Sequence, residues 1–435
     1  MSDRSSHIHV AIVGGGITGV ILALGLEKRG VNYTLYERAP TFTEIGAGIG
    51  FSPNAERALK AVDPQVYSVY KQVASTNDQE DYFIWVDGFK TNEIVAKLFI
   101  GVDAFQKGRR SDFLEAWSNL IPQEKVRFGK DTASIFQQDT GKVLMTFKDG
   151  SSAEADIVIG CDGIHSRVRQ LILGEANPAS YPSYTNKYCF RALVPMERAR
   201  AVLSEERTTQ RFMYNGSKAH CIIYPVAMGK FLNLLLVITD PNPWRIEDRH
   251  TARGDKKEAL DAYADWHPHV RAMVDLLPEK LDKWAIFDMF ENPAPHYNVG
   301  SVAIAGDAAD ALGPHLGSGA GFGIEDALVL SIMLEVADKS LDGKTGKSKA
   351  EVCRDSLAAY NSIRYERAQW LPGAMREASG LFQWQDGKVG SDSTNFESRI
   401  GQLFHTIWDN GIDKMASDAI RTFAEVSTSK PKVNL

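Results

Sequence analysis

Residues 8–37 read IHVAIVGGGITGVILALGLEKRGVNYTLYE, and this stretch decides the fold. A run rich in β-branched residues, 8–13, ends in three consecutive glycines, and a helix-like stretch follows over 17–28. A second apolar run, 31–36, ends in Glu37. The order strand, glycine turn, helix, strand predicts one βαβ unit.

Three glycines of this stretch, Gly14, Gly16 and Gly19, have the spacing GxGxxG. The first glycine allows a tight turn, the second lets the backbone approach a pyrophosphate, and the third permits close packing of the helix on the strand. The helix N-terminus attracts the phosphate charge. Glu37 ends the second strand, where a carboxylate can bind a pair of ribose hydroxyls. The motif predicts a dinucleotide site and leaves NAD and FAD open.

Two further motifs follow buried strand candidates and match no pattern of nicotinamide dehydrogenases. Residues 160–169 read GCDGIHSRVR, and residues 306–321 read GDAADALGPHLGSGAG. Asp307, at a strand end, can accept a hydrogen bond from a ribitol hydroxyl of a long cofactor. The glycines over 317–321 let backbone N–H groups and a helix start approach a flavin ring or its phosphates.

With these three motifs in this order, the chain resembles the class A flavoprotein aromatic hydroxylases, the family of the p-hydroxybenzoate and salicylate hydroxylases. The resemblance covers essentially the whole chain. It implies an α/β fold like that of p-hydroxybenzoate hydroxylase, in which a Rossmann-like FAD-binding domain carries an inserted, mostly antiparallel β-sheet domain for the substrate, followed by C-terminal helices. We expect the FAD-binding domain at 1–80, 106–180 and 296–340, the substrate-binding domain at 81–105 and 181–295, and the helical region at 341–435.

The middle of the chain supports this division, because strand candidates follow one another there with few helical interruptions. They cover residues 188–194, 221–225, 231–239 and 284–290. Helical patterns return at 323–337 and 348–382, and the stretch 338–348 between them reads as a surface loop.

The resemblance also assigns cofactor contacts beyond the first motif. It places Pro314 on the flavin face where oxygen reacts and Arg110 at the phosphate and ribose region of FAD. Asp162 would help to hold the structure that serves FAD and NAD(P)H, with a purely structural role as the alternative. The complete expected set is Gly14, Gly16, Gly19, Glu37, Ala47, Gly48, Arg110, Asp162, Asp307, Pro314, Gly317, Gly319, Ala320 and Gly321.

One position departs from the family pattern. Relatives usually read GDAAH where this chain has Asp310. An ionised carboxylate there would disfavour the anionic reduced form of the flavin, so local electrostatics are expected to differ.

The substrate side is expected to carry a cation and a hydrogen-bond donor. Flavin hydroxylation delivers an electrophilic oxygen, so the site should lower the pKa of a phenol and favour its phenolate. Arg191 and Tyr224 have contexts similar to those in fungal monooxygenases that dearomatise resorcinol aldehydes in azaphilone, sorbicillinoid and tropolone pathways. By that resemblance Arg191 stabilises the phenolate and Tyr224 positions the ring. The residues alone also allow an inter-strand salt bridge and a half-buried sheet tyrosine, and His220 and His315 are weaker candidates.

The expected activity is that of an FAD-dependent monooxygenase that uses NADPH or NADH and O2 to hydroxylate a small phenol ortho to its phenolate, with dearomatisation of a resorcinol aldehyde favoured. The alternative is a decarboxylating salicylate hydroxylase that gives catechol. Two rival classes are another FAD enzyme on this fold, such as a halogenase or an epoxidase, and a non-catalytic binding protein. The chain lacks the halogenase motif WxWxIP, and the joint presence of the DG and GD motifs argues against the binding protein.

Composition excludes several other classes. The net charge of -6 and the pI near 6.0 give no electrostatic footprint for nucleic acid or anionic lipid. The longest apolar run, 231–238, is too short to span a bilayer. Four scattered cysteines without a CxxC pair argue against a zinc site or a disulfide scaffold and fit a reducing compartment. We therefore expect a cytoplasmic protein without a metal, and the resemblance adds a homodimer as an expectation.

Overall fold

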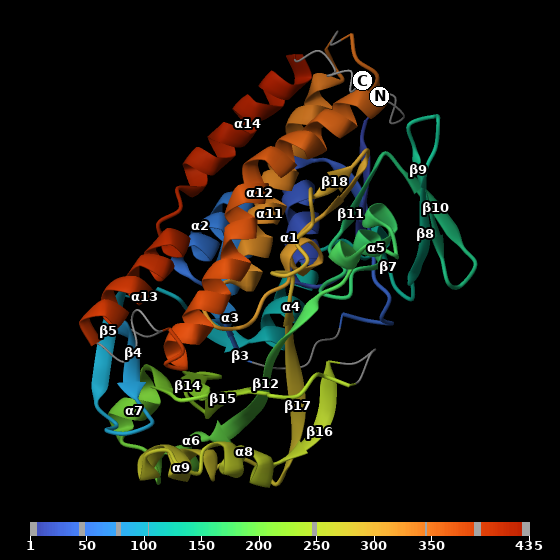
Figure 1. Ribbon diagram of the computed structural model, residues 1–435. Helices are drawn as coiled ribbons and strands as arrows, with labels where there is room; N and C mark the ends of the chain where they lie inside the picture. Colours follow the sequence, from blue (N-terminus) through green and yellow to red (C-terminus); the bar gives the residue numbers. More distant parts are fainter. Residues whose placement is uncertain are drawn as a thin grey trace.

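Two large β-sheets organise the chain, and helices from its C-terminal third run alongside both of them (Figure 1). The structure is a computed structural model that describes residues 7–42, 48–74, 80–102, 104–245, 250–343, 346–386 and 393–428. Within these ranges, none of the helices combines the length and the apolar composition that a bilayer span requires.

The first sheet has six strands in the order β18-β19-β11-β1-β2-β7. Five of them run parallel to their neighbours, and β18 is antiparallel to β19. The central strands are short and apolar because both faces of the sheet are covered. The strands are β1 (His9–Val13), β2 (Asn32–Tyr36), β7 (Val126–Arg127), β11 (Ile157–Gly160), β18 (Asn298–Val299) and β19 (Val302–Ile304). The predicted βαβ unit is thereby confirmed as β1, α1 (Ile17–Arg29) and β2.

Helix α1 lies against helix α11 (Gly319–Ser340). Both helices are buried along most of their length and are apolar nearly all round, as expected for helices enclosed by a sheet and other helices. A Cβ atom at Gly25 would lie 2.9 Å from the Ser331 Cβ atom, so this glycine lets the two helices approach closely.

The second sheet has eight strands in the order β16-β17-β12-β15-β14-β13-β4-β5. Neighbours are antiparallel except for the parallel pair of β13 and β4. The strands are β4 (Glu80–Asp87), β5 (Ile94–Val102), β12 (Ser183–Pro195), β13 (Arg211–Gly216), β14 (Ala219–Val226), β15 (Phe231–Thr239), β16 (Thr251–Asp255) and β17 (Lys280–Asp288). We propose that the two sheets mark the two domains, with the boundaries given above.

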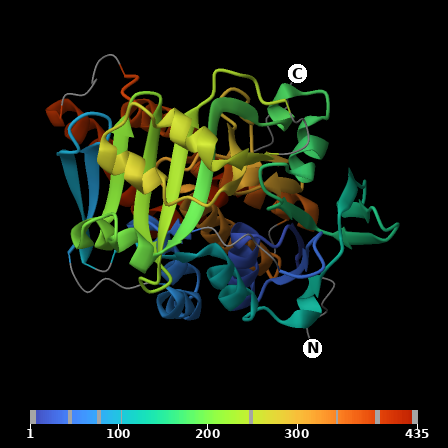
Figure 2. The ribbon, with the colours of Figure 1, turned by 90° about the horizontal axis from the view of Figure 1, so that it is seen from below.

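The two faces of the second sheet have different neighbours. Helices α8 (Lys256–Ala262) and α9 (Pro268–Val274) cover one face, as Figure 2 shows from below. Phe190, Ile223 and Leu234 belong to the core on that side. Because side chains alternate along a strand, the residues next to them point to the opposite face, toward the first sheet.

The remaining elements connect and cover these sheets. A three-stranded sheet consists of β8 (Thr132–Gln137), β9 (Val143–Phe147) and β10 (Ser152–Ala155), and β3 (Gly48–Gly50) pairs with β6 (Lys107–Arg109). The other helices are α2 (Pro53–Val62), α3 (Pro64–Val73), α4 (Arg110–Ser118), α5 (Arg167–Leu173), α6 (Met196–Arg200), α7 (Glu205–Thr209), α10 (Asp307–Asp310), α12 (Lys349–Phe382), α13 (Ser393–Trp408) and α14 (Ile412–Thr428).

Some boundaries expected from the sequence were wrong. The strand expected at 284–290 is β17, which begins at Lys280 and ends at Asp288, and the loop expected from 338 begins only after Ser340, where α11 ends. Strand β13 was missed, because its composition (RFMYNG) is mixed and a short strand has few residues to show alternation.

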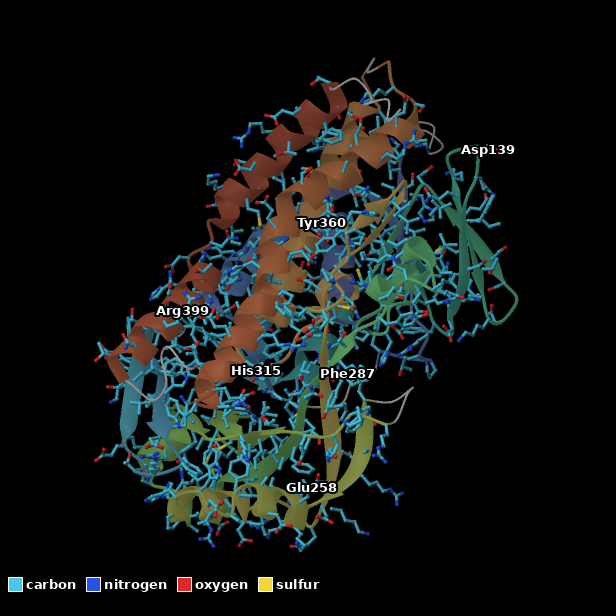
Figure 3. The ribbon with its side chains drawn as sticks, in the orientation of Figure 1. Asp139, Glu258, Phe287, His315, Tyr360 and Arg399 are labelled. Carbon is cyan, nitrogen blue, oxygen red and sulfur yellow. The ribbon has the colours of Figure 1, made fainter. Side chains whose placement is uncertain are left out.

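A buried charge network attaches α12 to α11. The fully buried Arg364 donates to the carboxylates of Glu325 and Asp326, at N–O distances of 2.5 and 2.6 Å. The second Asp326 oxygen accepts from the backbone N–H of Gly306, so the network reaches the GD motif. Tyr360, on the same side of α12 and at the centre of Figure 3, donates to the Ile304 carbonyl. This face of α12 therefore has a structural role.

Replacing Arg364 by methionine should lower the free energy of unfolding by about 3–5 kcal/mol, because the Asp326 carboxylate would be left buried without a cation and Glu325 would keep only Arg367. Denaturant unfolding of the flavin-free protein measures this. The control is Lys414→Ala, which removes an exposed ion pair with Asp418 on α14 and should leave stability close to wild type. Equal stability of Arg364→Met and wild type would contradict the structural role of the network.

Candidate active site

Three sequence motifs and Glu37 meet at one edge of the first sheet. Strands β1, β2, β11 and β19 are parallel, so their carboxyl ends lie on the same side. Gly14, Glu37 and Asp307 lie within three residues after β1, β2 and β19, and Asp162 lies two residues after β11. The chain reverses direction of winding at β1, which has β2 on one side and β11 on the other. Ligands of open α/β sheets bind at such a switch point.

The three glycines of the first motif have different surroundings in the structure. Gly14 has a φ of +108°, and a Cβ atom there would lie 2.4 Å from the Cys161 carbonyl oxygen. A Cβ atom at Gly19 would lie 2.0 Å from the Gly14 carbonyl oxygen. Packing therefore requires both glycines. At Gly16, which caps α1, a Cβ atom would meet none of the described atoms within 4 Å, so the space in front of this helix N-terminus is open.

Glu37 lies beside the glycine turn. Its carboxylate accepts from the backbone N–H of Gly15 at 2.6 Å and from that of Ala39 at 2.7 Å. These bonds place the carboxylate at the rim of the open space, and its binding of ribose stays a prediction.

The GD motif supplies a carboxyl group and a helix N-terminus. Asp307 is accessible from the cavity, while the surrounding protein raises the pKa of its carboxyl group, an effect that Arg110 opposes. Gly317 has a φ of +60°, and Gly319 begins α11 with no described atom closer than 3.7 Å to a Cβ position. The buried Ser318 Oγ has no hydrogen-bond partner among the described residues.

Not every predicted cofactor residue faces the cavity. A Cβ atom at Gly321 would lie 3.0 Å from the Ala55 Cβ atom, so this glycine packs α11 on α2. Both Asp162 oxygens accept bonds at the start of α5, from the Ser166 hydroxyl at 2.5 Å and the Val168 N–H at 3.0 Å. This geometry favours the structural alternative for Asp162. Ala47 lies outside the described residues.

Asp310 is buried, and it is not among the residues that line the cavity. Burial, reinforced by the neighbouring Asp326, raises the pKa of its carboxyl group well above the ordinary value. The neutral acid is therefore favoured. A neutral Asp310 would not disfavour the anionic reduced flavin, which was the effect expected from the sequence for an ionised carboxylate.

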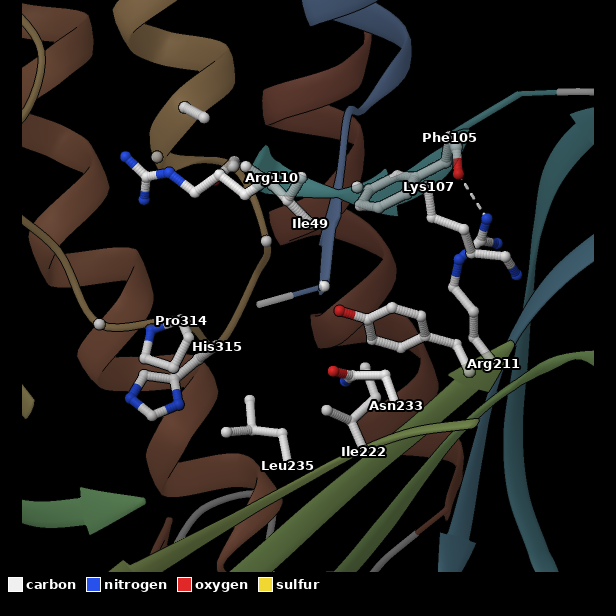
Figure 4. Close-up of a pocket in the computed structure, with 18 of the residues that line it drawn as sticks. Ile49, Phe105, Lys107, Arg110, Arg211, Ile222, Asn233, Leu235, Pro314 and His315 are labelled. Atoms are coloured by element: carbon white, nitrogen blue, oxygen red, sulfur yellow. Dashed lines mark hydrogen bonds between the residues drawn. The ribbon is translucent and has the colours of Figure 1, made fainter. Parts of the chain in front are cut away.

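A cavity of about 230 Å³ lies between the GD motif and the second sheet. This volume exceeds the roughly 150 Å³ of an engineered cavity that holds benzene, and residues assigned to the flavin line one part of it while residues of the second sheet line the other. Figure 4 shows Pro314 and His315 on one side and the sheet residues Ile222, Asn233 and Leu235 below. The lining residues are Gly48, Ile49, Gly50, Phe83, Phe105, Lys107, Arg110, Arg191, Arg211, Ile222, Tyr224, Asn233, Leu235, Asp307, Leu312, Gly313, Pro314, His315, Gly317, Ser318, Gly319 and Ala320.

Arg191 and Tyr224 both line this cavity, from β12 and β14. Arg191 is paired across the sheet with Leu235, and Tyr224 with Asn233, so all four share one face. Burial raises the pKa of Tyr224 to about 12 against the opposing effect of Arg191, so the phenol is a donor at neutral pH. A Cβ atom at Gly48 would lie 3.0 Å from the Tyr224 hydroxyl, which shows how closely β3 approaches this side chain.

His220 and His315 form a buried pair with ring centroids 5.3 Å apart. Burial lowers the pKa of His220 and brings that of His315 to about 3, so both imidazoles are neutral. His315 lines the cavity and lies between the C-terminal helices and the second sheet (Figure 3).

Sequence reasoning missed Lys107 and Arg211, two buried basic side chains that line the cavity. Arg211 forms an ion pair with the equally buried Asp81 at 2.7 Å. On β13 the apolar Phe212 and Tyr214 point to the other face, but the strand is too short for this alternation to single out Arg211 from the sequence.

The residues at this edge fit FAD. The open space at Gly16 suits a pyrophosphate, the unpartnered Ser318 Oγ and the bare helix start at Gly319 suit polar flavin atoms, and Asp307 offers an acceptor from the same loop.

Comparison with known proteins gives the same result. A family model described as an FAD binding domain matches residues 7–349. The FAD-dependent monooxygenase pigN of Monascus ruber is 46% identical over 95% of this chain and 96% of the relative, and the FAD-dependent monooxygenase orf3 of Aspergillus niger is 44% identical over 96% and 97%. A solved salicylate hydroxylase substrate complex has a TM-score of 0.83 at 27% identity, covering 96% of this chain and 98% of that one.

A parallel sheet with three nucleotide motifs at one edge, facing a mixed sheet across a cavity, defines a flavin hydroxylase of the p-hydroxybenzoate hydroxylase type. The chain belongs to the FAD binding domain family and is an FAD-dependent monooxygenase.

Replacing Gly16 by valine should remove bound flavin without unfolding the protein, because the added side chain meets open space where a pyrophosphate would lie. The φ of -74° and ψ of -177° at Gly16 suit a β-branched residue, apart from a modest cost at the helix cap. Flavin absorbance of the purified variant, and unfolding of both flavin-free proteins, test this. Gly380→Val on α12, where a Cβ atom also meets open space, should keep its flavin. Full flavin content in Gly16→Val would contradict the placement.

Proposed function

We propose that this monooxygenase uses NAD(P)H and O2 to hydroxylate a small phenol ortho to its phenolate, and that a resorcinol aldehyde, dearomatised by the reaction, is its substrate class. The observation that carries the proposal is the pair Arg191 and Tyr224 on one face of the second sheet, both open to a ring-sized cavity below Pro314. A cation and a phenol donor at the same wall are what a bound phenolate requires.

FAD would be held by the Gly14–Gly19 turn, Glu37, Arg110, Asp307 and the start of α11. When bound and reduced by NAD(P)H, FAD supplies the activation of O2, which is the difficult chemistry of the reaction. The protein contributes position, charge and exclusion of water.

Arg191 would stabilise the negative charge of the substrate oxygen. Arg191 is exposed and forms no salt bridge among the described residues, and the centre of the Trp284 ring lies 6.0 Å from its guanidinium carbon. Its charge is therefore available to a ligand. Tyr224, protonated because of its raised pKa, would donate to the same oxygen and orient the ring.

Apolar side chains would keep water away from the reacting ring. Ile222, Leu235 and Leu312 contribute to the cavity wall, and Phe105 lies at its far side. Exclusion of water limits side reactions of the activated oxygen and strengthens the electrostatic effect of Arg191.

The similar fungal proteins are named FAD-dependent monooxygenases, which supports the class of reaction. The dearomatising assignment rests on the sequence contexts of Arg191 and Tyr224. A second candidate, decarboxylating hydroxylation of salicylate to catechol, is favoured by the similarity to a solved salicylate hydroxylase. Product mass after aerobic turnover separates them. Loss of CO2 from salicylate supports the second candidate, and one added oxygen on a methylated resorcinol aldehyde, with loss of aromatic absorbance, supports the first.

The double variant Arg191→Met with Tyr224→Phe should lose phenol-stimulated NAD(P)H oxidation and product formation while FAD stays bound, because neither residue belongs to the proposed flavin site. Oxygen uptake, product mass and flavin absorbance measure the three quantities. The matched control, Arg198→Met with Tyr181→Phe, alters an arginine and a tyrosine on the exterior and should behave as wild type. Full activity of the first variant would refute the site assignment.

Arg191 should also lower the pKa of the bound phenol. Because a neighbouring cation favours the charged form, Arg191→Met should raise the pKa of a bound phenol by roughly one or more. The wild-type complex then contains phenolate at neutral pH, and the variant regains it only at higher pH. Absorbance titration of a bound nitrophenol against pH measures the change, and equal pKa values in both proteins would rule out this role.

A further inference from the structure

Lys107 and Arg211 lie together at one end of the cavity. Figure 4 shows them beside Phe105, on the side opposite Arg110, Pro314 and His315. Lys107 comes from β6 and Arg211 from β13, and their side chains are close enough for the charge of Arg211 to affect the amine. This end of the cavity therefore lies away from the GD motif.

The Arg211 side chain is fixed by contacts, but not all of its hydrogen-bond donors have an acceptor. Its Nη2 atom lies 2.7 Å from an Asp81 oxygen and also donates to the Phe105 carbonyl. The Phe105 ring lies 4.9 Å from the guanidinium carbon, and Phe105 itself has a φ of +54°, which is unfavourable for a bulky side chain. Such local strain is typical of functional sites. The Nη1 atom has no hydrogen-bond partner among the described residues.

The Lys107 side chain is likewise buried with a donor atom that has no acceptor among the described residues. Its residue is 4% exposed and Arg211 is 2% exposed, and Lys107 Nζ has no partner within hydrogen-bond distance in the described part of the chain. Most buried donors in proteins have an acceptor, so two adjacent exceptions on a cavity wall need an explanation.

The charge balance points to the missing group. Two buried basic side chains lie near one carboxylate, that of Asp81, which forms an ion pair with Arg211. Burial and the charge of Arg211 lower the pKa of Lys107 well below its ordinary value, while Asp81 opposes this. Either a protonated or a neutral Lys107 offers N–H donors. The second Asp81 oxygen, Oδ1, is also without a partner among the described residues, but Asp81 does not line the cavity, so an oxygen acceptor that reaches Lys107 and Arg211 from the cavity has to come from a ligand.

We infer that Lys107 and Arg211 form a subsite for an sp² oxygen, the carbonyl or carboxylate oxygen of an acyl group on the substrate ring. The inference rests on the proposed function, because it takes the occupant of the cavity to be a phenol. Hydrogen bonds at this end and the phenolate contact at Arg191 and Tyr224 would hold the ring at two points. Two points fix its rotation, so Lys107 is a positioning residue that decides which ring carbon faces the flavin side.

The test compares three ligands with one ring: resorcinol, 2,4-dihydroxybenzaldehyde and 2,4-dihydroxybenzoate. Dissociation constants are measured on the FAD-loaded protein by flavin absorbance and by calorimetry, and kcat and KM where turnover occurs. The variant is Lys107→Met, since an apolar side chain of similar size is tolerated where a buried charge stood. Lys107→Gln restores one donor. Lys97→Met, exposed on β5 of the same sheet, is the control.

Loss of one hydrogen bond of this kind should weaken binding of an acyl-bearing ligand about 10- to 100-fold and leave resorcinol unchanged. Partial recovery in Lys107→Gln is expected. A larger loss for the benzoate identifies a carboxylate as the occupant, and a larger loss for the aldehyde identifies a carbonyl; both support the subsite.

Equal losses for all three ligands, or none, would overturn the inference, as would failure of all three to bind the wild-type protein. Selective loss of acyl ligands without any oxidation of a phenol would leave the subsite standing and remove the proposed function. If phenols are oxidised and Lys107→Met has no effect on binding, the proposed function stands and the subsite is refuted.

Discussion

The close approach of backbone segments at Gly14 is the constraint on which the nucleotide site depends. The turn after β1 lies against the Cys161 carbonyl after β11, and Gly19 lies against the Gly14 carbonyl, at distances that leave no room for a side chain at either glycine. Thr18 fills the equivalent space toward Gly306 and Gly323, where added Cβ atoms would lie 2.4 and 2.2 Å from its Oγ1. Strand ends that are this close bring their polar residues to one edge, and the adjoining helix N-termini then face a common space.

The second sheet shows how one strand can serve a core and a reaction site at once. Phe190 and Leu234 pack toward α8 and α9, whereas Arg191 and Leu235, one residue further along, face the cavity. The apolar face stabilises the sheet through burial, and its rigidity holds the polar face. A site on paired strands is positioned more accurately than one on loops, which suits a reaction in which the protein supplies position and charge.

Charge is handled differently in the two buried networks. Arg364 has two carboxylate partners and supports the GD motif through Asp326 and Gly306. Arg211 and Lys107 have one carboxylate between them and open toward the cavity. A fully paired buried network serves structure, and an incompletely paired one on a cavity wall is available to a ligand.

The sequence by itself determined the βαβ unit, the three motifs and their order. Glycine spacing and β-branched runs are local properties, and they set the backbone conformation of their own segment. It also singled out Arg191 and Tyr224, though only through resemblance. Tertiary structure decided that these two share a cavity wall, that Gly321 serves packing, that both Asp162 oxygens cap α5, and that Lys107 and Arg211 meet. These facts depend on the pairing of strands far apart in the chain. Register and the side of a sheet on which a residue falls are set by that pairing, since a shift of one residue exchanges the two faces.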